Sequence, residues 1–275
     1  NQPIPFSTYI MGFLGASNQT FAEHRFSAML FGDYSVKGWW YYYFVVFLLK
    51  TSISVVFLLI ISALFGRGFR KDRMSELFVT VPVILLMMFT VASVLQGGVR
   101  YILPIYPFLF VYISKIVNVN IQYNKGFVQR RLIYFLILSL GFCHLFSSVT
   151  SFPHYLPYFN LIGGGSSNGY RCLSRVNTDL GQDLKGLAKY LEKNNVREVK
   201  LSYWGFAPPE IYNINDLPIK DIEKEIPEQE VYAISVHQID EYKWAKQYKP
   251  KCMIGHTLFI YDFRFVNYMN RKVGT

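Results

Sequence analysis

The stretch Gln96-Gly-Gly-Val-Arg-Tyr-Ile-Leu-Pro-Ile-Tyr-Pro-Phe-Leu-Phe-Val-Tyr-Ile-Ser114 decides how this chain is arranged. It places one arginine, Arg100, in a very short polar break between two long apolar runs, and Pro104 and Pro107 open the second run. Each run approaches the ~20 residues that a membrane-spanning helix needs. The stretch therefore predicts a corner at a bilayer surface, with a cation held between two spans.

The composition indicates a membrane protein. Hydrophobic residues make up 52% of the chain and charged residues only 17%, below the roughly 25% of soluble domains. Residues 1–150 hold 12 Lys/Arg against 4 Asp/Glu, whereas residues 151–275 hold 16 against 14. The basic excess belongs to the apolar half, where it serves to fix orientation. Because it is not clustered on a soluble face, no nucleic-acid partner is expected.

Four membrane spans are predicted, at about 41–64, 77–96, 101–117 and 132–149. The polar segments 66–76 and 125–131 carry seven Lys/Arg, against one in the Arg100 corner. Short loops rich in Lys/Arg stay cytoplasmic. The corner, residues 1–40 and everything after 150 are therefore expected on the extracytoplasmic side, with the aromatic segment Gly38–Phe44 at the membrane interface.

Three regions follow from this pattern. Residues 1–40 are expected to form an extracytoplasmic loop with interfacial helices, residues 41–150 the four-span membrane region, and residues 151–275 a small soluble extracytoplasmic α/β domain. The fold class is thus membrane all-α followed by α/β. In the last region, periodicity predicts helices at 179–194 and 239–248, strands at 197–203, 231–236 and 258–261, and a charged surface loop at 217–230.

Three residues are candidates for binding a phosphate group. The Arg100 guanidinium can make paired, charge-assisted hydrogen bonds to phosphate, and Tyr101 can add a hydroxyl donor; the alternative is that Arg100 only anchors the corner at lipid headgroups. Lys50 lies inside the first predicted span, where a charge is costly. It therefore either faces a cavity or a partner, or extends towards the interface. Together, Lys50 and Arg100 could hold a phosphate or diphosphate headgroup.

The remaining polar candidates are weaker. Glu23, His24 and Asp33 lie on the predicted outward side, where a carboxylate could act as general base towards an acceptor hydroxyl, although solvated loop charges are the simpler interpretation. No residues have zinc-site spacing, so no metal ligands are assigned. Cys172 and Cys252 could pair in an extracytoplasmic domain, or remain thiols. The glycine-rich passage 159–165 follows a span rather than a strand, which argues against a nucleotide-binding loop, and no cofactor is expected.

Several motifs resemble a known family. Trp39-Trp-Tyr-Tyr42, Phe47-Leu-Leu-Lys-Thr51 and Arg100-Tyr-Ile-Leu-Pro-Ile-Tyr-Pro-Phe108 resemble the later spans of polyprenyl-phosphate-sugar-dependent integral-membrane glycosyltransferases. This is the GT-C class, family 39-like, related to protein O-mannosyltransferases and aminoarabinose transferases. The tail is similar to the extracytoplasmic tail of the bacterial branch, and the motifs that carry this likeness are Tyr158-Phe-Asn160, Gly169-Tyr170, Asn177-Thr-Asp-Leu-Gly-Gln-Asp-Leu184, Tyr203-Trp-Gly-Phe-Ala-Pro-Pro209 and Ile254-Gly-His-Thr-Leu-Phe-Ile-Tyr-Asp262.

The resemblance implies a reaction. A sugar carried on a polyprenyl phosphate would be transferred to an acceptor hydroxyl of a protein, lipid or glycan, on the periplasmic side of the inner membrane. Arg100 and Lys50 would stabilise the charge on the departing phosphate. In this family the catalytic carboxylate lies in the first external loop, and nothing in this chain matches that loop. The resemblance therefore implies a C-terminal portion without the main catalytic carboxylate, and the catalytic residue stays unassigned.

This sequence also departs from the family pattern at two places in the tail. The family usually has Asp-Ser before the position of Asn177 and Trp before that of Gly181, whereas this chain has Arg175-Val176 and Leu180. An acidic role at position 175 is therefore not expected. The alternative function is a non-catalytic, membrane-anchored protein whose external domain binds a partner or a glycan. A transporter segment is less well supported, because no internal repeat is evident.

Overall fold

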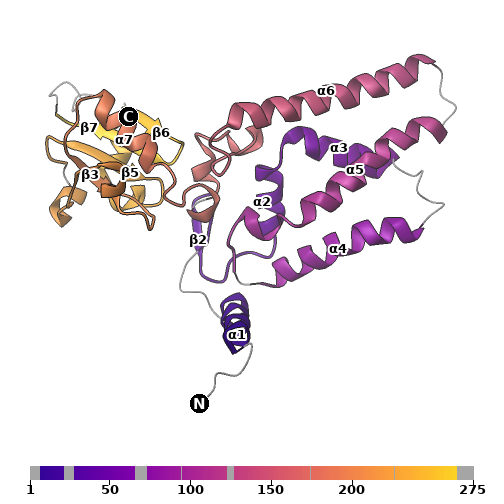
Figure 1. Cartoon of the computed structure of the whole chain (residues 1–275), viewed down its shortest axis with the longest axis horizontal. Helices are drawn as coiled ribbons and strands as arrows, with labels where there is room; N and C mark the ends of the chain where they lie inside the picture. Colours follow the sequence, from indigo (N-terminus) through magenta and orange to yellow (C-terminus); the bar gives the residue numbers. More distant parts are fainter. Residues whose placement is uncertain are drawn as a thin grey trace. The chain divides into compact units, whose positions relative to one another are not determined.

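A computed structural model describes residues 7–21, 28–65, 73–93, 95–122, 127–173, 175–225 and 227–264. The chain divides into two compact units, which Figure 1 shows with the sequence running from indigo to yellow. The first unit comprises Asn1–Phe152 and Phe159–Gly165, and the second comprises Pro153–Tyr158 and Ser166–Thr275. The two units are therefore described separately.

The first unit is mostly helical. Within it α5 packs against both α3 and α4, and α3 also packs against α6. A short antiparallel hairpin occurs in residues 1–40, where only helices and loops were expected; Phe31 and Gly32 have positive φ and form its turn. The elements of this unit are α1 (Ser7–Phe21), β1 (Ala28–Leu30), β2 (Asp33–Ser35), α2 (Tyr42–Lys50), α3 (Ile53–Phe65), α4 (Arg73–Ala92), η2 (Val99–Tyr101), α5 (Ile105–Gln122), α6 (Phe127–Ser151) and η3 (Leu161–Gly163).

Two helices in the described residues are long and apolar enough to cross a membrane, namely α4 over Met74–Ala92 and α6 over Arg131–Ser151. A third crossing is possible if α2 and α3 together form one span. The apolar part of α5, Ile105–Ile116, is shorter. The chain is therefore suited to a membrane, while the expected count of four spans and the extracytoplasmic side of the C-terminal region stay predictions.

The first predicted span, residues 41–64, is not one continuous helix. It is divided into α2 and α3, whose axes differ in direction by 112°. The break falls at Thr51, which has the extended conformation φ −89°, ψ 138°. Hydropathy alone does not reveal this break, because the long apolar runs on both sides of Thr51 and Ser52 dominate the average.

The second unit is built on a five-stranded mixed sheet with strand order β4-β3-β5-β7-β6. Strand β3 pairs in parallel with both β4 and β5, whereas β7 is antiparallel to β5 and β6. Its helix and strands are α7 (Leu184–Lys193), β3 (Val199–Ser202), β4 (Asp216–Leu217), β5 (Val231–Ser235), β6 (Cys252–Ile254) and β7 (Leu258–Asp262). Its 3-10 turns are η4 (Gly169–Arg171), η5 (Arg175–Asn177), η6 (Pro209–Tyr212), η7 (Asp221–Lys224), η8 (Ile239–Glu241) and η9 (Lys243–Lys246).

Apolar side chains cover both faces of this sheet. Alternate residues of a strand point to opposite faces, so β5 sends Val231 and Ala233 to one face and Tyr232 and Ile234 to the other. The first face packs against Leu184, Leu187 and Leu191 of α7. The second packs against an aromatic cluster that contains Tyr242, Trp244, Tyr261 and Phe263. The predicted α/β layer and its three strands are thus present.

Three details of the sequence-based prediction are wrong. The helix expected at 179–194 begins only at Leu184. Residues 239–248 form the separate 3-10 turns η8 and η9 rather than a helix, because Tyr242 and Trp244 are drawn into the aromatic core between and within these turns. The segment 217–230 was expected to be a surface loop, yet it includes part of β4 and the turn η7, and Glu223 within it is fully buried. Cys172 and Cys252, which could have paired, are thiols in this structure.

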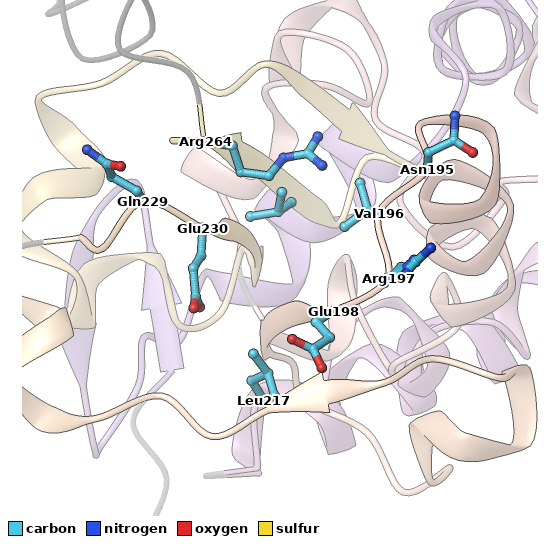
Figure 2. A pocket seen from close by; sticks show the side chains of 9 residues that line it. Asn195, Val196, Arg197, Glu198, Leu217, Gln229, Glu230 and Arg264 are labelled. Carbon is cyan, nitrogen blue, oxygen red and sulfur yellow. The ribbon is translucent and has the colours of Figure 1, made fainter.

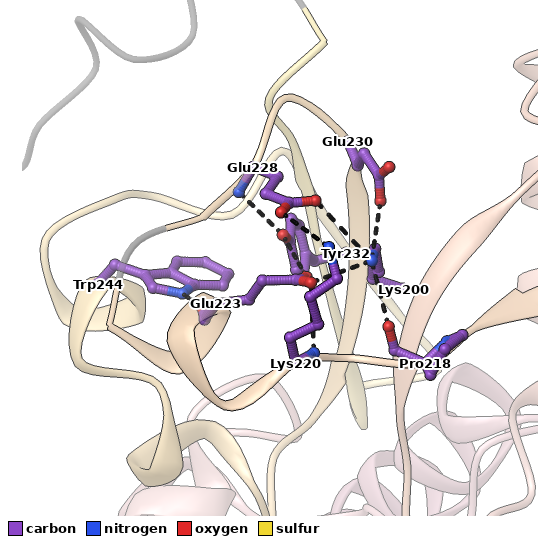
Figure 3. Close-up of polar contacts among 8 residues, drawn as sticks. All are labelled: Lys200, Pro218, Lys220, Glu223, Glu228, Glu230, Tyr232 and Trp244. Carbon is purple, nitrogen blue, oxygen red and sulfur yellow. Dashed lines mark hydrogen bonds and ion pairs between the residues drawn. The ribbon is translucent and has the colours of Figure 1, made fainter.

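A buried ion pair accounts for Glu223. Lys200 of β3 donates to the Glu223 carboxylate at 3.1 Å and to the carbonyl oxygen of Pro218 at 3.2 Å, and Glu230 lies 3.5 Å from the same ammonium (Figure 3). Tyr232 donates to the other oxygen of Glu223 at 2.9 Å. Burial alone would raise the pKa of Glu223, but the hydrogen bonds from Lys200 and Tyr232 lower it. Glu223 is therefore held as an anion inside the second unit.

Asp262, at the end of β7, predicts how the stability of the second unit depends on pH. Burial alone would raise the pKa of its carboxyl group, but hydrogen bonds from Arg264 and Lys251 outweigh burial and lower the pKa to about 2. A carboxyl group that binds fewer protons in the folded state stabilises that state above its unfolded pKa, and this contribution is lost as the pH falls towards the folded pKa.

We expect Asp262→Asn to lower the free energy of unfolding of the second unit by about 1–2 kcal/mol at pH 7, after allowing for partial solvent screening. The difference between the two proteins should shrink as the pH falls from about 4 to about 2. Denaturant unfolding followed by tryptophan fluorescence at several pH values measures it. Because only this difference is compared, the titration of other carboxyl groups cancels. A difference that stays constant down to the lowest pH would contradict the role of Asp262.

Candidate functional site at the break between α2 and α3

The break between α2 and α3 is an ordered polar site inside an apolar unit. Thr51, at the break, shares a hydrogen bond of 2.8 Å between its hydroxyl and that of Tyr106 on α5. Thr51 and Ser52 are both buried. Interruptions of apolar helices are tolerated where other parts of the protein satisfy the freed backbone groups. The question is therefore which residues satisfy the carbonyl groups at the end of α2.

Asn160 donates most of the hydrogen bonds that these carbonyl groups accept. Its side-chain amide donates to the carbonyl oxygens of Leu48 at 2.6 Å and Thr51 at 2.8 Å, and its backbone N–H donates to Leu49 at 3.0 Å. The last carbonyl groups of any helix need such external donors. Its side-chain oxygen in turn accepts from the N–H groups of Ile162 and Gly163, which starts the turn η3. Asn160 is only 4% exposed and joins η3 to the broken helix.

Lys50 is the last residue of α2 and is only 9% exposed. Its ammonium nitrogen lies 3.9 Å from the centroid of the buried Phe159 ring. A cation at the C-terminal end of a helix is favoured by the helix dipole, and a cation over an aromatic face is attracted to it. These contacts favour the interpretation in which Lys50 packs against a partner, here the Phe159 ring, over the one in which it extends towards the membrane interface.

Arg100 and Tyr101 lie in η2, close to the other end of α2. Arg100 is exposed, and its guanidinium carbon is 5.1 Å from the centroid of the Tyr101 ring. The ring of Tyr43, in the first turn of α2, is 6.5 Å from that of Tyr101, and the Tyr43 hydroxyl donates to Leu95 at 2.5 Å. Gly97 permits this packing, since a Cβ there would lie 2.2 Å from the Tyr101 ring. The Arg100 corner is therefore packed onto the start of α2.

Lys50 and Arg100 are thus associated with opposite ends of one nine-residue helix. From Tyr43 to Lys50 the helix rises by about 10 Å. A ligand that touches both cations would have to extend along α2. Their joint binding of one phosphate or diphosphate group stays a prediction.

The structure adds little for the acceptor-side candidates. Glu23 and His24 lie outside the described residues. Asp33 is exposed at the start of β2, where it pairs with Leu30 across the hairpin. A general-base role for any of the three stays a prediction.

Sequence reasoning missed a cluster of two histidines and one carboxylate in the second unit. His154 lies 3.4 Å from Asp183, and its ring centroid is 5.9 Å from that of His256, whose Nδ1 is 3.0 Å from the Ser167 hydroxyl. The hydroxyl of Thr257 donates to Asp183 at 2.5 Å. Gly255 and His256 both have positive φ and form the turn between β6 and β7. A Cβ on Gly255 would overlap the Asp183 carboxyl group, so only glycine lets this turn sit so close.

Burial shifts the pKa values of Asp183 and His256 in this cluster. It raises the pKa of Asp183, and hydrogen bonding from Thr257 and the two neighbouring histidines offset only part of that increase. Burial also lowers the pKa of His256, and His154 lowers it further. Among the described residues, no group of three or more His, Cys, Asp and Glu side chains is arranged to hold a metal ion.

A cavity of about 310 Å³ lies at the other end of the sheet, beside the first residues of β3 and β5 (Figure 2). Glu198, Glu230 and Arg264 are among the residues that line it. Two of the charged groups on its wall are already engaged, because Arg264 binds Asp262 at 2.9 and 3.0 Å and Glu230 faces Lys200. This cavity is consequently a less favourable anion or cation site than its composition suggests.

Comparison of the chain with protein-family models, with curated proteins and with solved structures finds no match in any of the three.

Proposed function

We propose that the chain is part of a membrane glycosyltransferase that moves a sugar from a polyprenyl-phosphate donor to an acceptor hydroxyl on the extracytoplasmic side. The observation that supports it most directly is Lys50, a cation buried at an ordered break in an apolar helix. Ionisable groups at such positions are costly and usually mark substrate or ion sites. The motif resemblance around Lys50 and Arg100 gives the substrate class.

In the proposed reaction the acceptor oxygen attacks the anomeric carbon of the sugar. A new glycosidic C–O bond forms, while the bond between the anomeric carbon and the phosphate oxygen breaks and its electron pair leaves with the phosphate. The acceptor proton passes to a carboxylate base outside the matched motifs. Lys50 and Arg100 would stabilise the phosphate as its charge grows, with their long side chains extended towards each other along α2, and Tyr101 would add a hydroxyl donor. Removing one preorganised group that stabilises a developing oxyanion typically costs about 10²–10³ in rate.

The test is sugar transfer by the native protein in membranes, with a radiolabelled polyprenyl-phosphate hexose as donor. We expect Arg100→Ala and Lys50→Met each to lower the transfer rate by about 100-fold, and Lys50→Arg to retain more activity than Lys50→Met because it keeps the cation. Lys37→Met is the matched control, since Lys37 is an exposed lysine of the same unit. Size-exclusion chromatography verifies that each variant is folded.

Full activity in both Arg100→Ala and Lys50→Met would overturn the phosphate role. The competing hypothesis, a non-catalytic membrane-anchored protein with an external binding domain, predicts no transfer by the native protein under any condition.

A further inference from the structure

The second unit contains a topological switch point. From β3 the chain moves to β4 on one side of it, and then crosses to β5 on the other side, with all three strands parallel. In open parallel α/β sheets, ligands bind at the carboxyl ends of the strands where the order reverses in this way. In this unit that location is the segment after β3 and the segment after β5.

Exposed aromatic side chains occur at this location. The segment after β3 carries Trp204, 42% exposed, and Phe206, 98% exposed. Leu180, on the segment that leads into α7, is also exposed. The backbone that carries them is closely packed: Gly181 approaches Gly205 so nearly that a Cβ on Gly181 would be 2.8 Å from the Gly205 Cα. Rigid aromatic groups lose little conformational freedom when they bind a ligand.

Polar groups surround these rings. The His237 ring centroid is 5.4 Å from that of Trp204, and its Nε2 lies 3.1 Å from the Asp179 carbonyl oxygen. Ser235 donates to the Asp179 carboxylate at 2.6 Å. The amide of Gln238 accepts from the Ser202 hydroxyl at 2.8 Å. The exposed ring of Trp204 is thereby bordered by imidazole and amide groups that neighbouring residues orient.

The lack of basic residues at this location indicates which classes of ligand it can bind. The segments 177–183, 202–208 and 235–238 contain no Lys or Arg. A nucleotide phosphate would be expected at the N-terminus of α7, but Asp183 occupies the N-cap position there and Asp179 precedes it. A nucleotide or another anionic ligand is therefore disfavoured. A pyranose sugar fits better, because its C–H faces can lie on aromatic rings while its hydroxyls bond to the polar rim.

We infer that Trp204, Phe206 and His237 form a binding site for a neutral saccharide at the carboxyl ends of β3 and β5. The aromatic rings of Trp204 and Phe206 contact the sugar faces, and His237 and Gln238 bind hydroxyl groups. This inference does not depend on sugar transfer by the first unit, since it uses only residues of the second unit.

The experiment is saturation-transfer NMR on the full chain in nanodiscs, with mannotriose and cellotriose as neutral probes and trigalacturonate as the anionic probe. We expect at least one neutral trisaccharide to bind and trigalacturonate to bind more weakly. Trp204→Ala should weaken the neutral sugar by about tenfold, the equivalent of one aromatic contact. Phe206→Ser should weaken it by roughly threefold and, at so exposed a position, without disturbing the fold.

Trp40→Ala is the matched control, because Trp40 is an exposed tryptophan of the first unit, and this variant should bind as the unaltered chain does. The inference is overturned if neither neutral trisaccharide binds, if binding persists unchanged in both Trp204→Ala and Phe206→Ser, or if trigalacturonate binds as well as the neutral sugars. If Trp204→Ala loses sugar binding but transfers sugar at the normal rate, the saccharide site is separate from the proposed active site.

Discussion

Asn160→Ala is expected to destabilise the first unit by about 3 kcal/mol, because it removes four side-chain hydrogen bonds from a buried position and leaves helix-end carbonyl groups without donors. Two of those bonds hold the Leu48 and Thr51 carbonyl groups, and two start η3. Thermal unfolding of the detergent-solubilised chain, followed by size-exclusion chromatography, measures the effect as a lowered midpoint.

Asn160→Asp gives the sharper comparison because its side chain has the same shape. It keeps an acceptor for Ile162 and Gly163 but removes both amide hydrogens and places a carboxylate against two carbonyl oxygens. We therefore expect it to be at least as destabilising as Asn160→Ala, by about 3 kcal/mol or more, at neutral pH. Asn168→Ala, at an exposed asparagine, serves as the control. If Asn160→Asp unfolds at the same temperature as the unaltered chain, Asn160 does not hold the break.

The break itself shows where sequence reasoning reached its limit. The apolar run over residues 41–64 was recognisable, and so was Lys50 as an unusual cation within it. The bend was not, because its principal donor, Asn160, comes 109 residues after Thr51 in the chain. An asparagine followed, after two further residues, by three glycines indicates a turn. Nothing in its local sequence indicates that it caps a distant helix.

The candidate residues were predictable to different degrees. Arg100 and Tyr101 were recognisable in the sequence as a polar interruption. Their packing against α2 was not, because it joins segments that are far apart in the chain. The histidines of the second unit looked scattered, yet His154 and His256 meet beside Asp183 because the β6–β7 turn returns to the start of α7. Positive φ at a histidine is uncommon, but only tertiary structure reveals it.

In the second unit, the strands were predicted more accurately than the segments that connect them. The alternation in β3, the apolar stretches of β5 and β7 and the helical spacing of α7 are local signals, and all four elements are present. Residues 239–248 carry a plausible helical pattern, but burial of Tyr242 and Trp244 in the aromatic core selects two 3-10 turns instead. Tertiary packing overrides weak local propensity in such segments.

Lys200→Met is expected to have the largest effect on the second unit, lowering its free energy of unfolding by about 3–4 kcal/mol at pH 7. Burial alone would lower the pKa of Lys200, but Glu223 and Glu230 raise it, so the ammonium is charged and compensates both. Glu223 is 0% exposed, and without Lys200 its carboxylate stays buried with no cation. Denaturant unfolding can be followed through Trp244, whose indole N–H donates to the Glu223 carbonyl oxygen at 2.7 Å.

The pH dependence and a double variant distinguish a buried charge from a lost packing contact. Without Lys200 the folded-state pKa of Glu223 should rise above its unfolded value, so the deficit is largest at neutral pH and diminishes as the pH falls through the range where the carboxyl group protonates. Lys200→Met with Glu223→Gln removes both charges and should recover most of the loss, leaving about 1 kcal/mol. Lys220→Met, at an exposed lysine paired with Glu228, should cost at most about 0.5 kcal/mol.

A double variant as unstable as Lys200→Met, with a deficit independent of pH, would show that the aliphatic part of Lys200 matters rather than its charge. If instead the charge dominates, the Lys200–Glu223 pair acts mainly to position η7. Glu223 lies in η7. Its carboxylate accepts a hydrogen bond from Tyr232, and its backbone carbonyl oxygen accepts one from Trp244. One buried glutamate would then join β3 and β5 through its carboxylate and η9 through its carbonyl oxygen, which explains why a charged segment that looked like a surface loop is folded into the core.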